Sequence, residues 1–139
     1  MNIKCIHNSG QFLNSDLIGQ YTGWDEKMTF LTITPNNTYI VYAISIINNH
    51  TFYMICDDDY GYIDFPQILP YELFEVTEKK WSKYWHKSSP VLSESDYKIG
   101  FKEYVEEPYF YGNLLEGNKR EIDIFSYWKK LIDQENTDY

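Results

Sequence analysis

The sequence lacks the short motifs that would identify an enzymatic reaction. It has no glycine-rich phosphate-binding loop and no G-x-S-x-G nucleophile elbow. Its three histidines, His7, His50 and His86, lie far apart and match neither an H-x-x-x-H nor a C-x-x-C spacing, so no zinc site is expected. The sequence therefore predicts a protein that is not an enzyme, with no catalytic residues, no cofactor and no metal.

Cysteine and long apolar runs are also scarce. The chain has two cysteines, Cys5 and Cys56. It has no run that approaches the roughly 18–20 apolar residues of a membrane span, and no basic segment followed by the apolar core of a signal peptide. We therefore expect a cytoplasmic protein that does not bind membranes, with both thiols reduced. Cys56 lies in an apolar run, which indicates a small core residue.

Basic residues are outnumbered by acidic ones. The chain has 12 Lys and Arg against 21 Asp and Glu, which gives a formal net charge of -9. Such a field repels phosphate backbones and argues against nucleic-acid binding. It would accelerate encounter with a basic protein, although it is equally consistent with acidity that only maintains solubility.

Aromatic residues, in contrast, are abundant. They make up 19% of the 139 residues, with 14 Tyr, 8 Phe and 4 Trp. The length predicts one domain, residues 1–139, and the 43% hydrophobic and 24% charged content is typical of a globular chain. Since a small core cannot bury so many rings, we expect several at the surface, where Tyr and Trp favour a binding face.

Residues 28–76 carry the clearest strand pattern and form the predicted centre of the fold. Three runs in it, Phe30–Ile33, Tyr39–Ile47 and Thr51–Cys56, are rich in β-branched and aromatic residues. Each is closed by residues that favour turns. The pattern predicts the α+β class, with an antiparallel β-barrel or a strongly curled sheet and a C-terminal packing helix.

Further strand and turn signals follow the third run. Gly61 is the expected positive-φ residue of a turn, and Tyr62–Phe65 is predicted as a short strand. Pro66 and Pro70 predict an irregular segment between them, because proline cannot donate to a strand ladder.

This order of strands and turns resembles that of SH3-like barrels in small bacterial and phage proteins. In those barrels, a strand region with a leucine-threonine pair and a tyrosine-x-valine pattern comes first. A turn with the pattern aspartate-aspartate-x-glycine follows. The barrel ends with a proline and then a leucine-phenylalanine-glutamate sequence. The resemblance covers residues 31–75 and implies a fold, without implying an activity. The matching residues are Leu31, Thr32, Tyr39, Val41, Asp57, Asp58, Gly61, Pro70, Leu73, Phe74 and Glu75.

A C-terminal helix is predicted over residues 118–134. Asn118 is its expected N-cap and Glu121 the capping-box partner. Apolar residues recur in it at spacings of three and four, which indicates a stripe that packs over the open side of the sheet. The stripe consists of Ile122, Phe125, Trp128, Leu131 and Ile132. The residues that we expect to be mostly buried in the whole chain are Ile40, Ile44, Phe52, Met54, Phe74, Phe125 and Trp128.

Shorter elements are predicted elsewhere. Ile3–His7 is a candidate strand, and Tyr97–Val105 alternates as a strand does. Residues 78–87 fit either one helical turn, which would align Trp81 with Trp85, or an extended edge segment. Tyr109–Tyr111 is expected to be an aromatic loop or a short strand.

Two clusters of residues could have a chemical role. The run Asp57–Asp59 could bind a divalent cation, but it lacks the ligand spacing of a calcium loop; it could equally be a solvated turn or an anchor for a basic partner. Cys5 and His7 are two residues apart, so a thiol nucleophile with its base is conceivable, although a small structural cysteine is the stronger interpretation.

The most favoured function is protein binding. In size, acidity and aromatic content the chain resembles, in general type, the immunity proteins of bacterial toxin–immunity pairs. The resemblance implies a monomer or weak homodimer that binds and neutralises a cognate, basic toxin domain. The residues expected to bind the partner are Asp57, Asp58, Asp59, Tyr60, Tyr62, Trp81 and Trp85. The alternatives are a small enzyme or ligand-binding protein with an aromatic cleft for a sugar or other small molecule, and a phage or mobile-element accessory protein.

Overall fold

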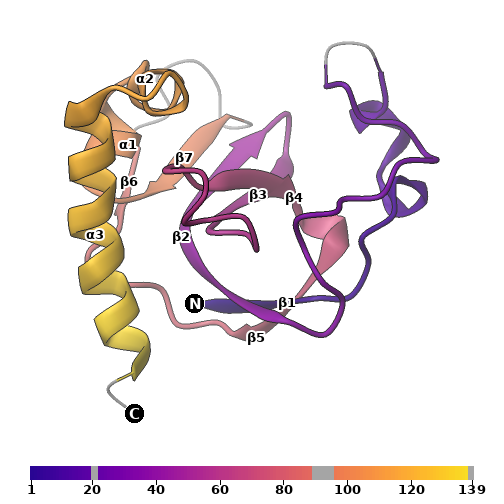
Figure 1. Cartoon of the computed structure of the whole chain (residues 1–139), viewed down its shortest axis with the longest axis horizontal. Helices are drawn as coiled ribbons and strands as arrows, with labels where there is room; N and C mark the ends of the chain where they lie inside the picture. The colour runs from indigo at the N-terminus through magenta and orange to yellow at the C-terminus, as the bar shows by residue number, and fades with distance from the viewer. Residues whose placement is uncertain (20–21, 89–95, 138–139) are drawn as a thin grey trace.

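The structure, a computed structural model, describes residues 1–19, 22–88 and 96–137. It belongs to the α+β class: an antiparallel sheet curls round on itself, and the C-terminal helix lies along one side of it (Figure 1). The strands are β1 (Asn2–Cys5), β2 (Thr38–Ile47), β3 (His50–Ile55), β4 (Gln67–Pro70), β5 (Phe74–Glu78), β6 (His86–Lys87) and β7 (Tyr97–Gly100). The helices are α1 (Lys102–Glu106), α2 (Phe110–Leu115) and α3 (Lys119–Thr137), and the 3-10 turns are η1 (Gly10–Phe12), η2 (Ser15–Leu17) and η3 (Tyr71–Leu73).

Most of the sheet is attached to β2. One edge of β2 pairs with β3, from Val41 opposite Ile55 to Ile47 opposite His50. The other edge is divided between two strands: residues 38–40 pair with β1, and residues 43–46 pair with β7. Beyond these, β5 pairs with β1 and β6 pairs with β7. The sheet therefore splits along this edge of β2.

The sheet is curled but is not closed into a barrel. Its main path runs β4-β3-β2-β1-β5, and the two end strands are joined through η3. Within the described residues β4 and β5 do not pair, because the 3-10 turn between them makes a corner instead of a shared hydrogen-bonded edge. Of the two forms that the pattern allowed, the curled sheet is confirmed and the barrel is wrong.

An irregularity at Tyr42 lets β2 contribute to two hydrophobic cores. Before it, Tyr39 and Val41 face the core inside the curl; after it, Ile44 does. Tyr42 and Ala43 both face the second core, which lies under α1, α2 and α3. A bulge of one residue exchanges the faces of a strand, so the same β-branched run serves both sides of the sheet.

The predicted core residues are found in these two clusters. Ile44, Phe52, Met54, Phe74 and Phe125 are buried, as expected. Ile40 and Trp128 are partly buried at the edge of the core under the helices. Trp128 stays partly accessible because its indole N–H reaches out to the carboxylate of Glu103, at 3.1 Å from each oxygen. The C-terminal helix is confirmed, with bounds of 119–137 in place of 118–134.

The predicted capping box is not formed by Asn118 and Glu121. The Asn118 backbone N–H donates to the carbonyl of Asn113, and the Glu121 carboxylate accepts from Arg120 at 2.9 Å. Both groups therefore have other partners. None of the helices in the described residues has the length and apolar character that crossing a membrane requires.

Two predicted strands are wrong. Phe30–Ile33 is irregular, and the nearest bridge, between Ser9 and Thr29, lies just before it. Phe30 and Ile33 are buried, but no strand of the described residues pairs with them. Tyr62–Phe65 is a series of turns, because the backbone N–H groups of Tyr62 and Ile63 both donate to the carbonyl of Asp59. Both runs have the composition of a strand, but among the described residues neither lies along the edge of a strand with which it could pair.

The segment between the prolines is also different from the prediction, since residues 67–70 form β4. Pro70 is tolerated there because β4 is an edge strand, where a missing N–H breaks no ladder on the outer side.

The remaining short elements differ in their bounds or type. Ile3–His7 is a strand only as far as Cys5, and Tyr97–Val105 is a strand only as far as Gly100, after which α1 begins. Tyr109–Tyr111 leads into α2 instead of forming a loop or strand. Residues 79–85 are neither a helix nor a strand, and only the two residues of β6 at the end of the segment are extended and paired.

Candidate protein-binding surface

The turn that contains Asp57–Asp59 is stabilised internally by its first aspartate. Asp57 is only 8% exposed, and its Oδ1 accepts a hydrogen bond from the backbone N–H of Asp59 at 3.1 Å. Burial is the main cause that raises the pKa of this carboxyl, and the neighbouring aspartates raise it further. Asp57 is thus a structural residue of the turn, and its side chain is largely withdrawn from any partner.

The second aspartate fastens the turn to the preceding loop. The Asp58 carboxylate accepts from the hydroxyl of Thr34 at 2.6 Å and from that of Tyr39 at 2.8 Å, and its backbone N–H donates to the carbonyl of Thr32. Burial, with Asp58 as a lesser cause, raises the pKa of Tyr39 to about 12, so this phenol keeps its proton and remains a donor. The bonds with Thr32 and Thr34 fix residues 32–34 against the turn, and the bond from Tyr39 joins β2 to it.

The two tyrosines of the turn have opposite environments. Tyr60 packs edge-on to Phe125 of α3, with ring centroids 6.2 Å apart, and the Nζ of Lys129 lies 5.3 Å from its ring. Tyr62, two residues on, is 94% exposed. Gly61 makes this possible with a φ of 115°, a conformation that a side chain would disfavour. The turn thus anchors one ring in the core and presents the other to solvent.

We call residues 57–64 the acidic loop. On its surface Asp58 and Asp64 are exposed and Asp59 is partly exposed. Accessible carboxylates therefore both precede and follow Tyr62 in the sequence. Leu31 is 86% exposed and precedes Thr32, which is hydrogen-bonded to the loop. The sequence pattern placed Leu31 in a strand and did not suggest it as a surface residue. A rigid, acidic loop with accessible apolar side chains is therefore available for contact.

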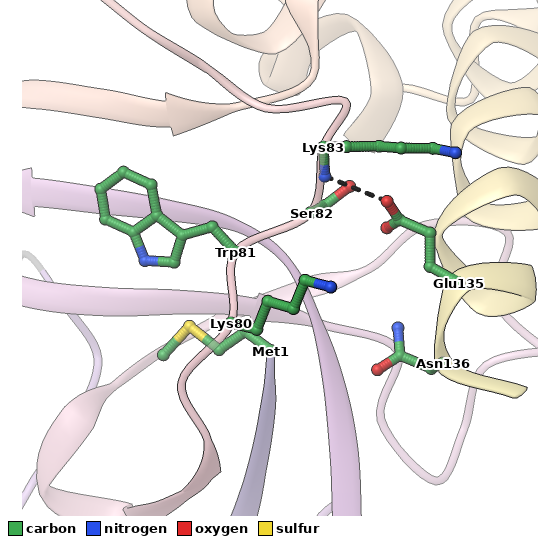
Figure 2. Close-up of a pocket in the computed structure, with 7 residues that line it drawn as sticks. All are labelled: Met1, Lys80, Trp81, Ser82, Lys83, Glu135 and Asn136. Carbon is green, nitrogen blue, oxygen red and sulfur yellow. Dashed lines mark hydrogen bonds between the residues drawn. The ribbon is translucent and has the colours of Figure 1, made fainter. Parts of the chain in front are cut away.

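The two predicted tryptophans lie elsewhere, in the segment between β5 and β6. Trp81 is 51% exposed and packs against Trp85, with ring centroids 6.1 Å apart. Trp85 is partly buried, and its Nε1 has no hydrogen-bond partner in the part of the chain that the structure describes. Trp81 lines a pocket between this segment and the last turns of α3 (Figure 2).

The predicted partner-binding residues therefore form two areas. The acidic loop touches α3 at Phe125, whereas the pocket reaches Glu135 and Asn136, roughly 15 Å further along the helix axis. Among residues 1–19, 22–88 and 96–137, no hydrogen bond, ion pair or ring contact joins Trp81 to the acidic loop.

The arrangement of Cys5 and His7 does not form a nucleophile and its base. The Cys5 thiol is buried and donates to the backbone carbonyl of His7 at 3.3 Å, while the His7 ring stacks on Phe12 at 3.6 Å. Burial raises the pKa of the Cys5 thiol, and burial likewise raises the pKa of Cys56 to about 12. Both cysteines are free thiols with suppressed reactivity.

Metal ligands are not gathered in the described ranges, where no group of three or more His, Cys, Asp or Glu side chains is placed to hold an ion. The closest contact of a histidine with an acid is His50 with Glu72, which involves a single carboxylate. Within those ranges, the Asp57 carboxylate accepts from a backbone N–H and the Asp58 carboxylate accepts from two hydroxyl groups.

No protein-family model matches the chain, and no curated protein or solved structure matches it significantly. The contacts described above are therefore the basis on which a function can be proposed.

Proposed function

We propose that this protein is a non-enzymatic binding module that neutralises a cognate, basic protein domain, in the manner of the immunity proteins of bacterial toxin–immunity pairs. The acidic loop is the contact surface. The partner that binds this surface is a toxin domain whose active site is surrounded by basic residues, and binding blocks access to that active site.

The observation that carries this proposal is the exposure of Tyr62 on a loop that is otherwise tightly held. The Asp57 carboxylate accepts from a backbone N–H within the loop, and the Asp58 carboxylate accepts from the hydroxyls of Thr34 and Tyr39. These bonds restrict the loop, so it has little conformational freedom to lose when a partner binds. A preorganised loop loses less entropy on binding than a flexible one. An aromatic side chain presented in this way is typical of the residues that dominate interface energies.

Charge supports the same kind of partner. The net charge of -9 attracts a basic domain over long range, and exposed Asp58 and Asp64 concentrate part of it at the loop. Such charges act mainly on the association rate, whereas a buried ring acts mainly on the dissociation rate. The two contributions can therefore be measured separately.

The first experiment identifies the partner. The chain is co-expressed with the C-terminal domain encoded by the gene immediately upstream, and growth and complex formation are followed. We expect that domain to arrest growth alone and to be neutralised by a stable complex with this chain. A metabolic enzyme in that position, or a toxic domain that the chain neither binds nor neutralises, would contradict the proposal.

The second experiment tests the surface by binding kinetics at two salt concentrations. Tyr62→Ala is expected to raise the dissociation rate by about tenfold or more, as the loss of an interface anchor does. The double variant Asp59→Asn with Asp64→Asn is expected to slow association at low salt and to flatten its salt dependence. Tyr109→Ala is the matched control, since Tyr109 is a similarly exposed ring at the start of α2. Equal effects of Tyr62→Ala and Tyr109→Ala would place the interface away from the acidic loop.

A second candidate function is that of a small-molecule-binding protein with an aromatic cleft. The observation that favours it is the pocket beside Trp81, which combines an exposed indole with polar side chains. The two functions do not share residues, so each can be tested in variants that leave the other surface intact.

A further inference from the structure

A groove between α1 and α3 lies apart from the two areas described above. Glu103 of α1 lines one side of it, and side chains from the N-terminal half of α3 line the other. The α3 residues are Arg120, Asp123, Ile124, Tyr127 and Trp128. The volume of the groove is about 380 Å³, within the range of roughly 300–1,000 Å³ that is common for small-molecule sites. It shares no lining residue with the acidic loop or with the pocket beside Trp81.

Two aromatic rings meet at a corner in this groove. Tyr127 is 58% exposed, and its ring centroid lies 5.0 Å from that of Trp128 at an interplanar angle of 75°. The indole of Trp128 is fixed by ring contacts with Phe101 at 6.4 Å and with Tyr84 at 5.8 Å. The face of an aromatic ring carries partial negative charge and attracts a cation within about 6 Å of its centre. The groove therefore presents an ordered aromatic surface to a positive group.

Glu103 adds a negative charge beside the rings. The indole N–H of Trp128 donates to both oxygens of this carboxylate, at 3.1 Å each, so the carboxylate is held next to the indole. In the part of the chain that the structure describes, no ammonium or guanidinium group lies within 4 Å of it. Its charge is therefore not neutralised by an ion pair there, although both of its oxygens already accept a hydrogen bond.

Arg120 also lines the groove, and its positive charge is offset by two carboxylates. Its Nη1 donates to Glu107 at 2.8 Å and to Glu121 at 2.9 Å, and its Nη2 donates to the other oxygen of Glu107 at 2.9 Å. Asp123 is paired with Lys119 at 2.7 Å. The charged lining residues and their ion-pair partners thus comprise four carboxylates and two cations, so the groove as a whole attracts positive charge.

The state of the Glu103 carboxylate favours a cation without N–H donors. A lysine or arginine head group loses water when it enters such a groove, and each of its N–H donors then needs an acceptor. A quaternary ammonium group has no N–H donors, so an aromatic surface and a nearby negative charge are sufficient to bind it. Tyr127, Trp128 and Glu103 supply these two features.

We propose that this groove binds the trimethylammonium group of a small, free compound of the choline class. The head group lies against the rings of Tyr127 and Trp128, and Glu103 is its counter-charge. A lipid head group of the same chemistry also carries a phosphate, which the net charge of -9 and the carboxylates at the groove repel. The site is independent of the acidic loop and adds a small ligand to the protein-binding module.

The test is an NMR titration of the full chain with choline at constant ionic strength. The reference compounds are neohexyl alcohol, in which carbon replaces the charged nitrogen, and ethanolamine, in which N–H groups replace the methyl groups. We expect the indole N–H signal of Trp128 and the ring signals of Tyr127 to shift with choline, with a Kd of about 1–10 mM. Each reference compound should bind at least about fivefold more weakly. Equal affinity for either one, or no shift up to about 50 mM choline, would overturn the proposal.

Variants assign the roles of the residues. Glu103→Gln keeps an oxygen for the indole N–H and removes the charge, so it should weaken choline binding about fivefold and leave neohexyl alcohol binding unchanged. Glu106→Gln is the matched control, because Glu106 is exposed on the same helix and does not line the groove. Tyr127→Leu should also weaken choline binding about fivefold, with Tyr109→Leu as the control at an exposed ring outside the groove. If a control matches its paired variant, the assigned site is wrong.

Sedimentation with phosphatidylcholine vesicles distinguishes the two sources of a trimethylammonium group. We expect the chain to stay in the supernatant while it still binds choline in solution. Sedimentation of the chain with the vesicles would overturn the assignment to a free compound.

Discussion

Nε2 of His50 lies 2.6 Å from Oε1 of Glu72, and each of the two side chains is 13% exposed. His50 begins β3, whereas Glu72 belongs to η3, the corner between β4 and β5. The second oxygen of Glu72 accepts from the backbone N–H of Asn14 at 2.9 Å, and the His50 ring packs against Tyr71. One carboxylate thus ties the corner of the sheet to both the β2–β3 hairpin and the segment between β1 and β2.

Replacing Glu72 by Ala should destabilise the protein by about 1–3 kcal/mol, because His50 loses its partner in a partly buried site and the exposed N–H of Asn14 loses its acceptor. The measurement is urea denaturation, with hydrogen exchange of the Asn14 amide as the local readout. Glu75→Ala is the control, since Glu75 is exposed on β5. If both variants unfold at the same urea concentration, the Glu72 contacts contribute nothing to stability.

Gly100 is required where β7 meets β2. A Cβ built on it would lie 2.6 Å from the Cβ of Ala43, so Gly100→Ala should cost about 1–3 kcal/mol by overpacking. Gly112 in α2 has no atom within 4 Å of the same position, and Gly112→Ala should instead stabilise the protein by about 0.4–1 kcal/mol. Thermal unfolding of the two variants compares them directly. A neutral Gly100→Ala would mean that β7 does not pack on β2 as described.

Phe125 is the central contact of α3. It is fully buried and makes edge or tilted ring contacts with Tyr42, Tyr60 and Phe101. Phe125→Ala should therefore destabilise the chain by about 3–5 kcal/mol, whereas Tyr127→Ala, on the exposed side of the same helix, should change stability by less than about 0.5 kcal/mol. Chemical denaturation distinguishes them. A loss under about 1 kcal/mol for Phe125→Ala would show that α3 is peripheral.

The buried carboxyl of Asp57 should reduce stability as the pH rises. Its pKa in the folded state is raised, chiefly by burial, so the folded protein binds this proton more tightly than the unfolded chain does. Its contribution is therefore most favourable below its ordinary pKa and is lost as the pH rises through the raised value. Asp57→Asn keeps an oxygen for the N–H of Asp59 and removes this titration. We expect the variant to gain stability relative to the wild type between about pH 3 and pH 7 as the pH increases.

The control for that pH series is Asp64→Asn, because Asp64 is exposed and is not among the groups that shift the pKa of Asp57; this variant should follow the wild-type curve. A parallel pH dependence in the wild type and in Asp57→Asn would contradict the assignment of the titration to Asp57.

Sequence patterns predicted the elements whose partners are close in the chain. The hairpin of β2 and β3 was recognised from two continuous runs of β-branched and aromatic residues joined by a turn, and the helix α3 from its apolar period of 3.6. Phe30–Ile33 has the same composition as a strand, and its first and last residues are buried. A strand also needs a free edge, however, and the edge of β2 is already shared by β1 and β7. Local propensity contains no information about that competition.

The candidate surfaces were predictable in part. Asp57 bonds a backbone N–H two residues on, a common aspartate turn that would have indicated its structural role. Tyr62 was expected at the surface from its place after the acidic run, and it is exposed. The exposure of Leu31 could not be read from its neighbours, since Phe30 before it and Ile33 two residues after it are buried. The run of lysines over residues 79–87 was visible, but its meeting with Glu135 and Asn136 depends on how α3 packs.

The double pairing of β1 has a consequence for how the chain matures on the ribosome. The hairpin of β2 and β3 can close as soon as residue 55 is outside the exit tunnel, because its partners are neighbours in the chain. Residues 2–5 leave the tunnel before this hairpin, yet one of their two edges remains unpaired until residues 74–78 have also left. During that interval a strand with an open edge is exposed in the nascent chain, which is the condition under which strands pair with the wrong partner. Residues 2–5 are thus synthesised before residues 74–78, on which their second edge depends.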